Sequence, residues 1–380
     1  MKIYQEKLEG GNWTPLYKTS NAVPVDCQVT LVFGARNLVS TPSVYEYIKA
    51  KYHNADIVLA STSGEIVDNT VKDDTVIVTA IHMERSKVKC VNGILSITGS
   101  SFDLGAQLMR VLNGAELKSV MVISDGSHVN GTELVAGFNS ENVHNVTISG
   151  GLAGDGADFD KTATGLNCVP HEKNVIAIGF YGENVVVNHG SFGGWDEFGT
   201  ERKITKSAKN ILHELDGKSA LILYKEYLGD YANELPGSAL LFPLALKSAD
   251  NETTLVRTIL SIDEEADTMT FAGNMPEGAK VRLMKANFDK LIDGSSEAAQ
   301  QSIKDPEVTP GLAILISCVG RKLILQQRTE EEVEAAREIF GPETAICGFY
   351  SYGELSPYTN SGKCELHNQT MTITTLAEKP

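Results

Sequence analysis

Short apolar runs of strand length alternate with amphipathic stretches over the first half of the chain. The segment after the first run places Val44, Ile48 and Tyr52 at helical spacing, which predicts a helix with one face packed on a sheet. The runs that predict strands are residues 29–33, 57–60, 76–81, 120–124 and 146–149. This alternation predicts an α/β fold in which helices cover a sheet.

A second predicted domain begins near residue 216. Residues 203–215 are expected to form a helix, and a turn then leads into a strand at residues 220–224. The length of the chain allows two domains that each bury a core. We therefore expect two mixed α/β domains, residues 1–215 and 216–380, with sheets covered by helices.

Two apolar runs in the second predicted domain indicate neighbouring strands. Residues 312–317 are nearly all apolar, which is typical of a strand buried on both faces. A helix is expected from Thr329, because Thr329 and Glu332 have the spacing of a capping box, and the next strand leads into Gly348. If these strands are parallel, the residues that follow them lie at the carboxyl edge of the sheet, where ligands bind in open parallel sheets.

Two turns with the same pattern follow predicted strands near opposite ends of the chain. In residues 61–66 and 348–357, a hydroxyl side chain and one further residue precede Gly-Glu and an apolar residue. Glycine lets another group approach the backbone closely, and a glutamate accepts hydrogen bonds from an ammonium group. We predict that the two turns form one ligand site between the domains, and the pattern suggests related halves. The side chains assigned to the site are Ser61, Ser63, Glu65, Ser351, Tyr352 and Glu354.

Arg321 follows the predicted buried strand and is expected at the edge of the sheet. Its planar guanidinium suits a carboxylate, either that of a ligand or that of Glu354. An arginine, a glutamate and a serine-rich turn together match both ends of an amino acid. Replacing Arg321 with alanine is therefore expected to weaken ligand binding and to leave the fold intact.

Six segments resemble, in order along nearly the whole chain, the signature motifs of the FIST family. They are residues 61–66, 150–156, 224–229, 318–321, 348–357 and 366–370. The resemblance implies a sensory, ligand-binding module with amino acids as a suggested class of ligand, and it adds Asn368 to the candidate site. It further implies signalling through a separately encoded partner such as a histidine kinase. Ala60 stands where a cysteine is common in the family, so no thiol role is implied there.

Two alternative functions stay open at this point. One subgroup of the family binds haem and senses nitric oxide, in which case His367 or His189 would be the axial ligand. Ser351 lies in Gly-x-x-Ser-x-Gly, one residue away from the nucleophile elbow of hydrolases, with His367 downstream as a base. Residues 150–156 lack the spacing of a dinucleotide-binding fingerprint, and no histidine pair has the close spacing of metal ligands.

Composition and charge argue against several other classes. The chain carries 49 acidic and 33 basic residues, for a net charge of -16, which repels nucleic acids and anionic lipids. No apolar run approaches the roughly 20 residues of a membrane helix, and the N-terminal residues lack the apolar core of a signal peptide. The six cysteines form no CxxC pair. We therefore expect a cytoplasmic binding protein, not an enzyme, without a metal site and, haem aside, without a cofactor.

Overall fold

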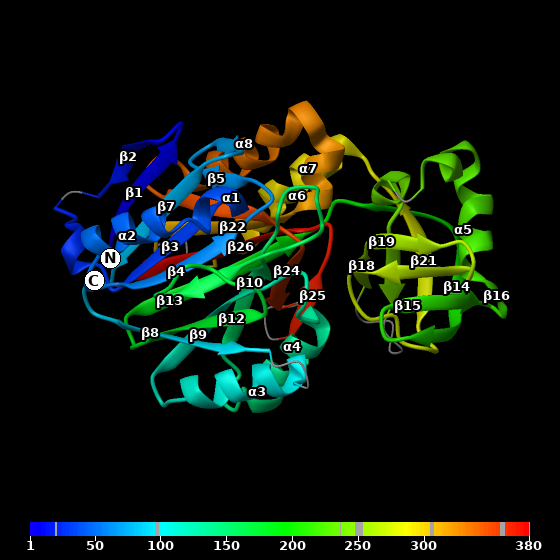
Figure 1. Ribbon diagram of the computed structural model, residues 1–380, viewed down its shortest axis with the longest axis horizontal. Helices are drawn as coiled ribbons and strands as arrows, with labels where there is room; N and C mark the ends of the chain where they lie inside the picture. The colour runs from blue at the N-terminus through cyan, green and yellow to red at the C-terminus, as the bar shows by residue number, and fades with distance from the viewer. Residues whose placement is uncertain are drawn as a thin grey trace.

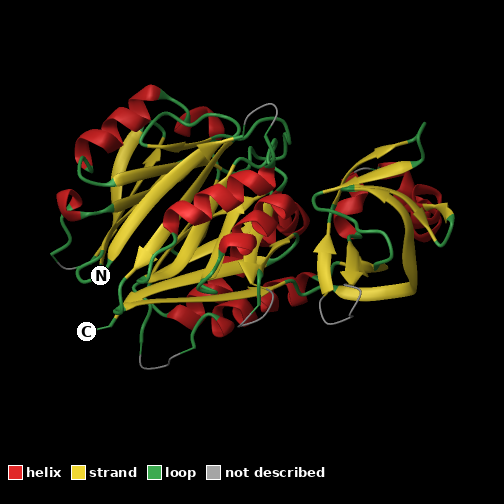
Figure 2. Cartoon of the chain, turned by 90° about the horizontal axis from the view of Figure 1, so that it is seen from below, coloured by secondary structure: helices red, strands yellow, loops and turns green. Residues whose placement is uncertain are grey.

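The structure is a computed structural model that describes every residue except 20, 96–98, 236, 248–253, 305–307, 358–361 and 380. It contains a large body and a smaller one, and both ends of the chain lie on the side of the large body that faces away from the smaller one (Figure 1). The smaller body is one stretch of sequence, residues 196–285, inserted into the large body. Figure 2 shows the two bodies from below.

Three six-stranded sheets build the large body. The first contains, in spatial order, β11 (Thr164–Leu166), β4 (Asp56–Ser61), β3 (Val29–Gly34), β7 (Val76–His82), β1 (Lys2–Glu9) and β2 (Asn12–Lys18). The second contains β25 (Cys364–His367), β24 (Gly353–Pro357), β10 (Thr147–Leu152), β9 (Leu117–Ser124), β12 (Asn174–Tyr181) and β8 (Lys87–Ile94). The third contains β6 (Thr70–Lys72), β5 (Glu65–Val67), β23 (Ala345–Ser351), β22 (Leu312–Cys318), β26 (Met371–Glu378) and β13 (Val185–Phe192).

Helices cover the outer faces of these sheets, while their inner faces pack together. The helices are α1 (Arg36–Val39), α2 (Pro42–Lys51), α3 (Ser101–Leu112), α4 (Gly131–Glu141), α6 (Phe288–Gln301), α7 (Val319–Leu325) and α8 (Thr329–Phe340), with short 3-10 turns η1 (Pro24–Asp26) and η4 (Gln326–Arg328). The central core draws on all three sheets, for example through Phe33, Ile123 and Ile316, and the rings of Phe33 and Phe349 lie 4.7 Å apart. The predicted α/β class is therefore confirmed. No helix in the described part of the chain has the length and apolar character needed to cross a membrane.

The three sheets share one plan, which reveals three repeats instead of two related halves. Each has a central parallel pair (β3 with β4, β9 with β10, β22 with β23). A third strand pairs antiparallel with the first of these (β7, β12, β26), and an outer strand follows it (β1, β8, β13). The segment between the second and third strands of each repeat joins another repeat's sheet: β5 pairs with β23, β11 with β4, and β24 with β10. This exchange ties the repeats into one body.

The smaller body interrupts the third repeat between β13 and α6. Its eight-stranded sheet contains β18 (Thr254–Arg257), β17 (Leu244–Lys247), β21 (Lys280–Lys285), β14 (Asp196–Ala208), β15 (Ile211–Leu215), β20 (Thr268–Phe271) and β19 (Ile259–Asp263), with β16 (Lys218–Ser219) beside β15. Helix α5 (Ala220–Leu228) and the turns η2 (Gly229–Glu234) and η3 (Gly237–Leu241) complete it. The sequence boundary expected at residue 215 falls between β15 and β16, which pair with each other. In space, the second and third sheets combine strands from both sides of that boundary.

Three local predictions are wrong. Residues 203–215 form strands β14 and β15, because pairing with β21 and β20 overrides their helical pattern. Residues 220–224 begin helix α5, where the Ser219 hydroxyl caps the Ile222 backbone N–H. Thr329 is not an N-cap, because turn η4 runs directly into α8. The Thr329 hydroxyl donates to the Gln326 carbonyl at 2.6 Å.

Candidate functional site

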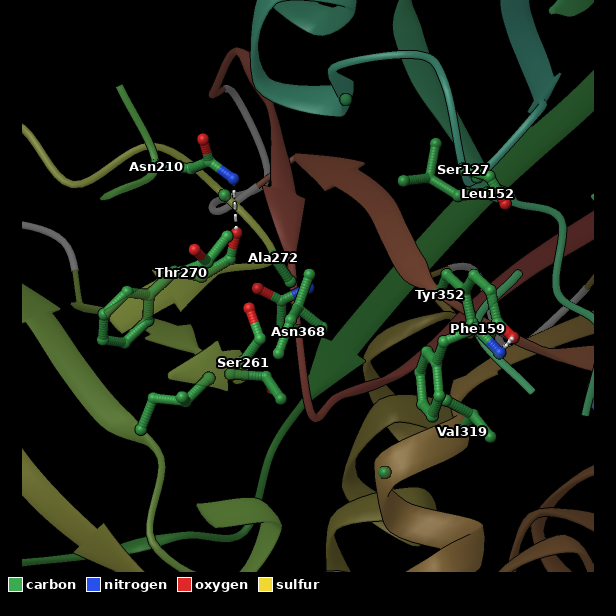
Figure 3. A pocket seen from close by; sticks show the side chains of 18 of the residues that line it. Ser127, Leu152, Phe159, Asn210, Ser261, Thr270, Ala272, Val319, Tyr352 and Asn368 are labelled. Atoms are coloured by element: carbon green, nitrogen blue, oxygen red, sulfur yellow. Dashed lines mark hydrogen bonds between the residues drawn. The ribbon is translucent and has the colours of Figure 1, made fainter. Parts of the chain in front are cut away.

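A cleft of about 660 Å³ lies between the two bodies. The large body contributes the ends of β9, β10 and β22, and the smaller body contributes β19 and β20. Figure 3 shows Asn368 in the middle of this cleft, between Thr270 and Ala272 of the smaller body and Tyr352 and Phe159 of the large one. The volume falls within the range of about 300–1,000 Å³ that is typical of small-molecule sites. The cleft is therefore the candidate site.

The side-chain amide of Asn368 forms the polar floor of the cleft, and the side-chain amide of the next residue, Gln369, lies behind Gly320. Both are fully buried, and their nitrogen and oxygen atoms form no hydrogen bond with any described residue. The Gln369 amide lies against Gly320, which lines the cleft, because a Cβ at that glycine would come within 2.4 Å of its nitrogen. A buried polar group without a partner costs about 1–3 kcal/mol. The Asn368 amide is therefore positioned to bind a polar ligand in the cleft.

The backbone holds this pair of amides in place. Gln369 has a left-handed φ of 60°, which is uncommon for a residue other than glycine. Its carbonyl accepts hydrogen bonds from Trp195 Nε1 at 2.9 Å and from Arg321 at 3.4 Å. Trp195 lies in the segment that leads into the smaller body, so the turn that carries the amides also contacts the connection between the bodies.

The structure brings the two glycine–glutamate turns together, as the sequence predicts. The Ser63 N–H donates to the Tyr350 carbonyl at 2.9 Å, and the Tyr350 N–H donates to the Gly64 carbonyl at 2.9 Å. The second repeat adds a third turn, since the Gly154 N–H donates to the Ser61 carbonyl at 3.0 Å and the Ser63 hydroxyl donates to the Gly156 carbonyl. Three equivalent turns, each with glycine followed by an acidic residue, therefore meet at the ends of the parallel strands.

Of the predicted site residues, Tyr352 and Asn368 line the cleft. The others lie behind it in the described structure, buried within the turns or, for Arg321, within α7. They are Ser61, Ser63, Glu65, Arg321, Ser351 and Glu354.

The two glutamates have the same hydrogen bonds, which fasten each turn to the last strand of its own repeat. Glu65 accepts from the Thr62 hydroxyl and from the N–H and hydroxyl of Thr75, at 3.2 and 2.7 Å. Glu354 accepts from the Ser351 hydroxyl at 2.7 Å and from the N–H and hydroxyl of Thr370, at 3.2 and 2.9 Å. In the second repeat, the corresponding hydrogen bond is made by Asp125, which accepts from the N–H of Lys173, the residue directly before β12. The shared pattern is thus explained by the repeats.

Burial raises the pKa of both glutamates, although the hydroxyl and N–H donors lower it. The pKa of Glu65 rises to about 7 and that of Glu354 to about 8. In the unfolded state both groups have the ordinary pKa of 4.5. Between pH 4.5 and the raised pKa values, the folded state therefore binds more protons than the unfolded state. Stability therefore falls as the pH rises through that window.

We predict that Glu354→Gln flattens this pH dependence, because glutamine does not ionise. The midpoint of thermal unfolding, Tm, should fall less between pH 5 and pH 8 in the variant than in the wild type. Calorimetry at several pH values measures the difference, and Glu334→Gln, at an exposed position on α8, is the control. Parallel curves for Glu354→Gln and the wild type would show that Glu354 does not titrate in this range.

Arg321 is buried and forms an ion pair with Glu332, not with Glu354. The Arg321 Nη2 atom lies 2.8 Å from Glu332 Oε2, and both side chains are fully buried. The guanidinium also donates to the carbonyls of Gly193 and Leu291, each at 2.6 Å. Arg321 thus joins α8 to the chain on both sides of the inserted body.

The loop between β9 and α4 supplies part of the cleft that the sequence did not indicate. Asp125 is buried and accepts from the Ser127 N–H at 2.7 Å and from the Thr162 hydroxyl at 2.8 Å. Its second oxygen lies 3.1 Å from His128 Nδ1 and orients this imidazole, which lines the cleft. An aspartate directly after an apolar strand is the available sequence signal.

The geometry gives no support to the two alternative functions at this cleft. Neither His189 nor His367 lines it; His367 Nε2 lies 3.0 Å from the Ser356 carbonyl, and burial lowers the His367 pKa to about 4. The Ser351 hydroxyl is buried and donates to Glu354, so it is not presented as a nucleophile. Among the described residues, no group of three or more histidine, cysteine or acidic side chains is arranged to hold a metal ion.

Models of two protein domains match the chain: the FIST N domain over residues 28–218 and the FIST C domain over residues 220–357. The protein therefore belongs to the FIST family, whose domains are sensory, ligand-binding domains of signal transduction. Both matches meet near the expected sequence boundary.

Similarities to solved structures are weak. A chorismatase is 9% identical, with a TM-score of 0.35 over 99% of this chain and 98% of its own. A cyanuric acid hydrolase from A. caulinodans is 7% identical, with a TM-score of 0.20 over 78% of this chain and 100% of its own. Comparison with curated proteins gave no match. These scores support no inference about activity.

Proposed function

We propose that this protein is a cytoplasmic sensor that binds a small zwitterionic ligand of the amino acid class in the cleft between its two bodies. The observation that carries the proposal is the buried, unpartnered amide of Asn368 in the cleft lining, with the equally unpartnered amide of Gln369 behind Gly320. Each amide offers N–H donors and a carbonyl acceptor. In the cleft, the Asn368 amide matches a carboxylate through its nitrogen atom and an ammonium group through its oxygen atom.

The charge of the cleft supports a ligand without net charge. Asp160 is the one Asp, Glu, Lys or Arg among the described residues that line it. An anionic ligand would lack a lysine or arginine partner there, whereas a zwitterion needs none. Signalling would then pass to a separately encoded partner such as a histidine kinase, and Arg321 would support the site by holding the Gln369 turn.

We predict that Asn368→Ala weakens binding of amino acids by about 10- to 100-fold, because hydrogen bonds to charged groups contribute about 1.5–3 kcal/mol. A thermal-shift screen of the full chain with single amino acids identifies the ligand, since a ligand that binds the folded state raises Tm. Isothermal titration then compares the wild type with Asn368→Ala and with the control Asn12→Ala on exposed β2.

Two results would contradict the proposal. One is the absence of any Tm shift with amino acids, and the other is unchanged affinity in Asn368→Ala. The haem alternative is tested on the same sample by its absorbance spectrum, where a Soret band would replace the amino acid proposal with that of a haem sensor.

A further inference from the structure

The cleft has an apolar half opposite its polar floor. Phe159 of the large body and Leu260 of the smaller body are 45% and 46% exposed, and both line the cleft. Leu240 and Ile259 of the smaller body and Leu152 of the large body extend the apolar lining. Large apolar side chains that remain exposed within a cleft gain stability when a ligand covers them.

The aromatic part of this lining is held rigidly. The rings of Phe159 and Tyr352 stack, with 4.8 Å between centroids and 15° between planes. The Phe159 N–H donates to the Tyr352 hydroxyl oxygen at 3.0 Å, and that hydroxyl donates to Asp155. Phe159 also has a left-handed φ of 52°. The surface that faces the cleft is therefore formed before a ligand arrives, so little conformational entropy is lost on binding.

We infer that the ligand is an amino acid with a large apolar side chain, and that aromatic side chains bind best. Its charged groups bind the Asn368 amide, and its side chain packs against Phe159 and Tyr352. Phe159 is then the residue that determines specificity. This inference rests on the proposed function, and it adds the size and polarity of the ligand side chain.

The size of the cleft agrees with this assignment. Its volume of about 660 Å³ leaves room for a large side chain beside the Asn368 amide. Stacked aromatic rings gain stability beyond the burial of their area. Aromatic ligands would therefore gain most from the lining that Phe159 and Tyr352 provide.

Isothermal titration of the full chain with phenylalanine, tryptophan, leucine and glycine tests the inference. The aromatic amino acids should bind at least about tenfold more tightly than glycine, and Phe159→Ala should remove about tenfold of this preference. Phe288→Ala is the matched control, because Phe288 is 43% exposed at the start of α6 and lies outside the cleft lining. Leu260→Ser, on the opposite wall, should also reduce the preference.

The outcomes separate this inference from the proposed function. Equal affinities for glycine and phenylalanine, or an unchanged preference in Phe159→Ala, would overturn the side-chain specificity. The proposed function would still stand in that case, provided that Asn368→Ala loses binding. If no amino acid binds the wild type, both the specificity and the proposed function are overturned.

Discussion

Replacing Arg321 with alanine is expected to lower the free energy of unfolding by about 3–5 kcal/mol, because it leaves a buried charge without its partner. Glu332 would keep hydrogen bonds from the Tyr350 hydroxyl at 2.5 Å and the Ser317 hydroxyl at 3.1 Å, but would lose the guanidinium. The carbonyls of Gly193 and Leu291 would also lose their donors. This outcome replaces our expectation from the sequence that the fold of Arg321→Ala stays intact.

Denaturant unfolding of the variant provides the measurement, with Arg110→Ala as the control. Arg110 forms an exposed ion pair with Glu141 at 3.0 Å, and such pairs contribute about 0–1 kcal/mol. Removing both Arg321 and Glu332 should cost less than the sum of the two single changes, because the double variant leaves no unpaired charge. A stability of Arg321→Ala within 1 kcal/mol of the wild type would show that the buried pair contributes little.

The strands that the sequence predicted correctly are those buried on both faces. Residues 312–317 correspond to β22, and the run into Gly348 corresponds to β23, which pairs with it in parallel. Continuous apolar runs of this length leave few alternatives to a buried strand. The prediction that the two glycine–glutamate turns lie together also holds, because both turns follow the second parallel strand of their repeats.

The repeats and the inserted body could not be predicted, because the deciding contacts are distant in sequence. The turn of the second repeat carries Gly154-Asp155 instead of Gly-Glu, and the carboxylate that bonds to the chain before β12 is that of Asp125, so only two turns look alike in sequence. The strands at residues 203–215 depend on partners such as β21, about 70 residues further on. The local pattern of apolar residues does not indicate that pairing.

The same reason limits how much of the cleft the sequence reveals. Asn368 and Tyr352 were found because they lie in motifs that resemble those of a known family. Phe159 belongs to no motif, and it reaches the cleft because it packs on Tyr352, nearly 200 residues later in the chain. The smaller body forms the facing wall of the cleft because it is inserted between β13 and α6.

Replacing Gly348 with alanine is expected to have the largest effect, a loss of more than about 4 kcal/mol that prevents stable folding. A Cβ at this position would lie 1.8 Å from the Leu315 carbonyl oxygen and 2.7 Å from its carbonyl carbon. These are backbone atoms of the adjacent parallel strand, so they cannot move aside as a flexible side chain would. Gly150 has the same relation to Val122 in the second repeat, where the distance would be 1.9 Å.

Soluble yield and Tm of Gly348→Ala and Gly150→Ala measure this effect. Gly237→Ala is the control, because a Cβ there has no atom of the described residues within 4 Å, chain neighbours aside, and the residue is not in the left-handed region. We expect the control to retain the wild-type Tm, since the added methyl group meets open space. A soluble Gly348→Ala with a Tm within about 3 °C of the wild type, which corresponds to roughly 1 kcal/mol, would show that β22 and β23 can separate at this point without loss of the fold.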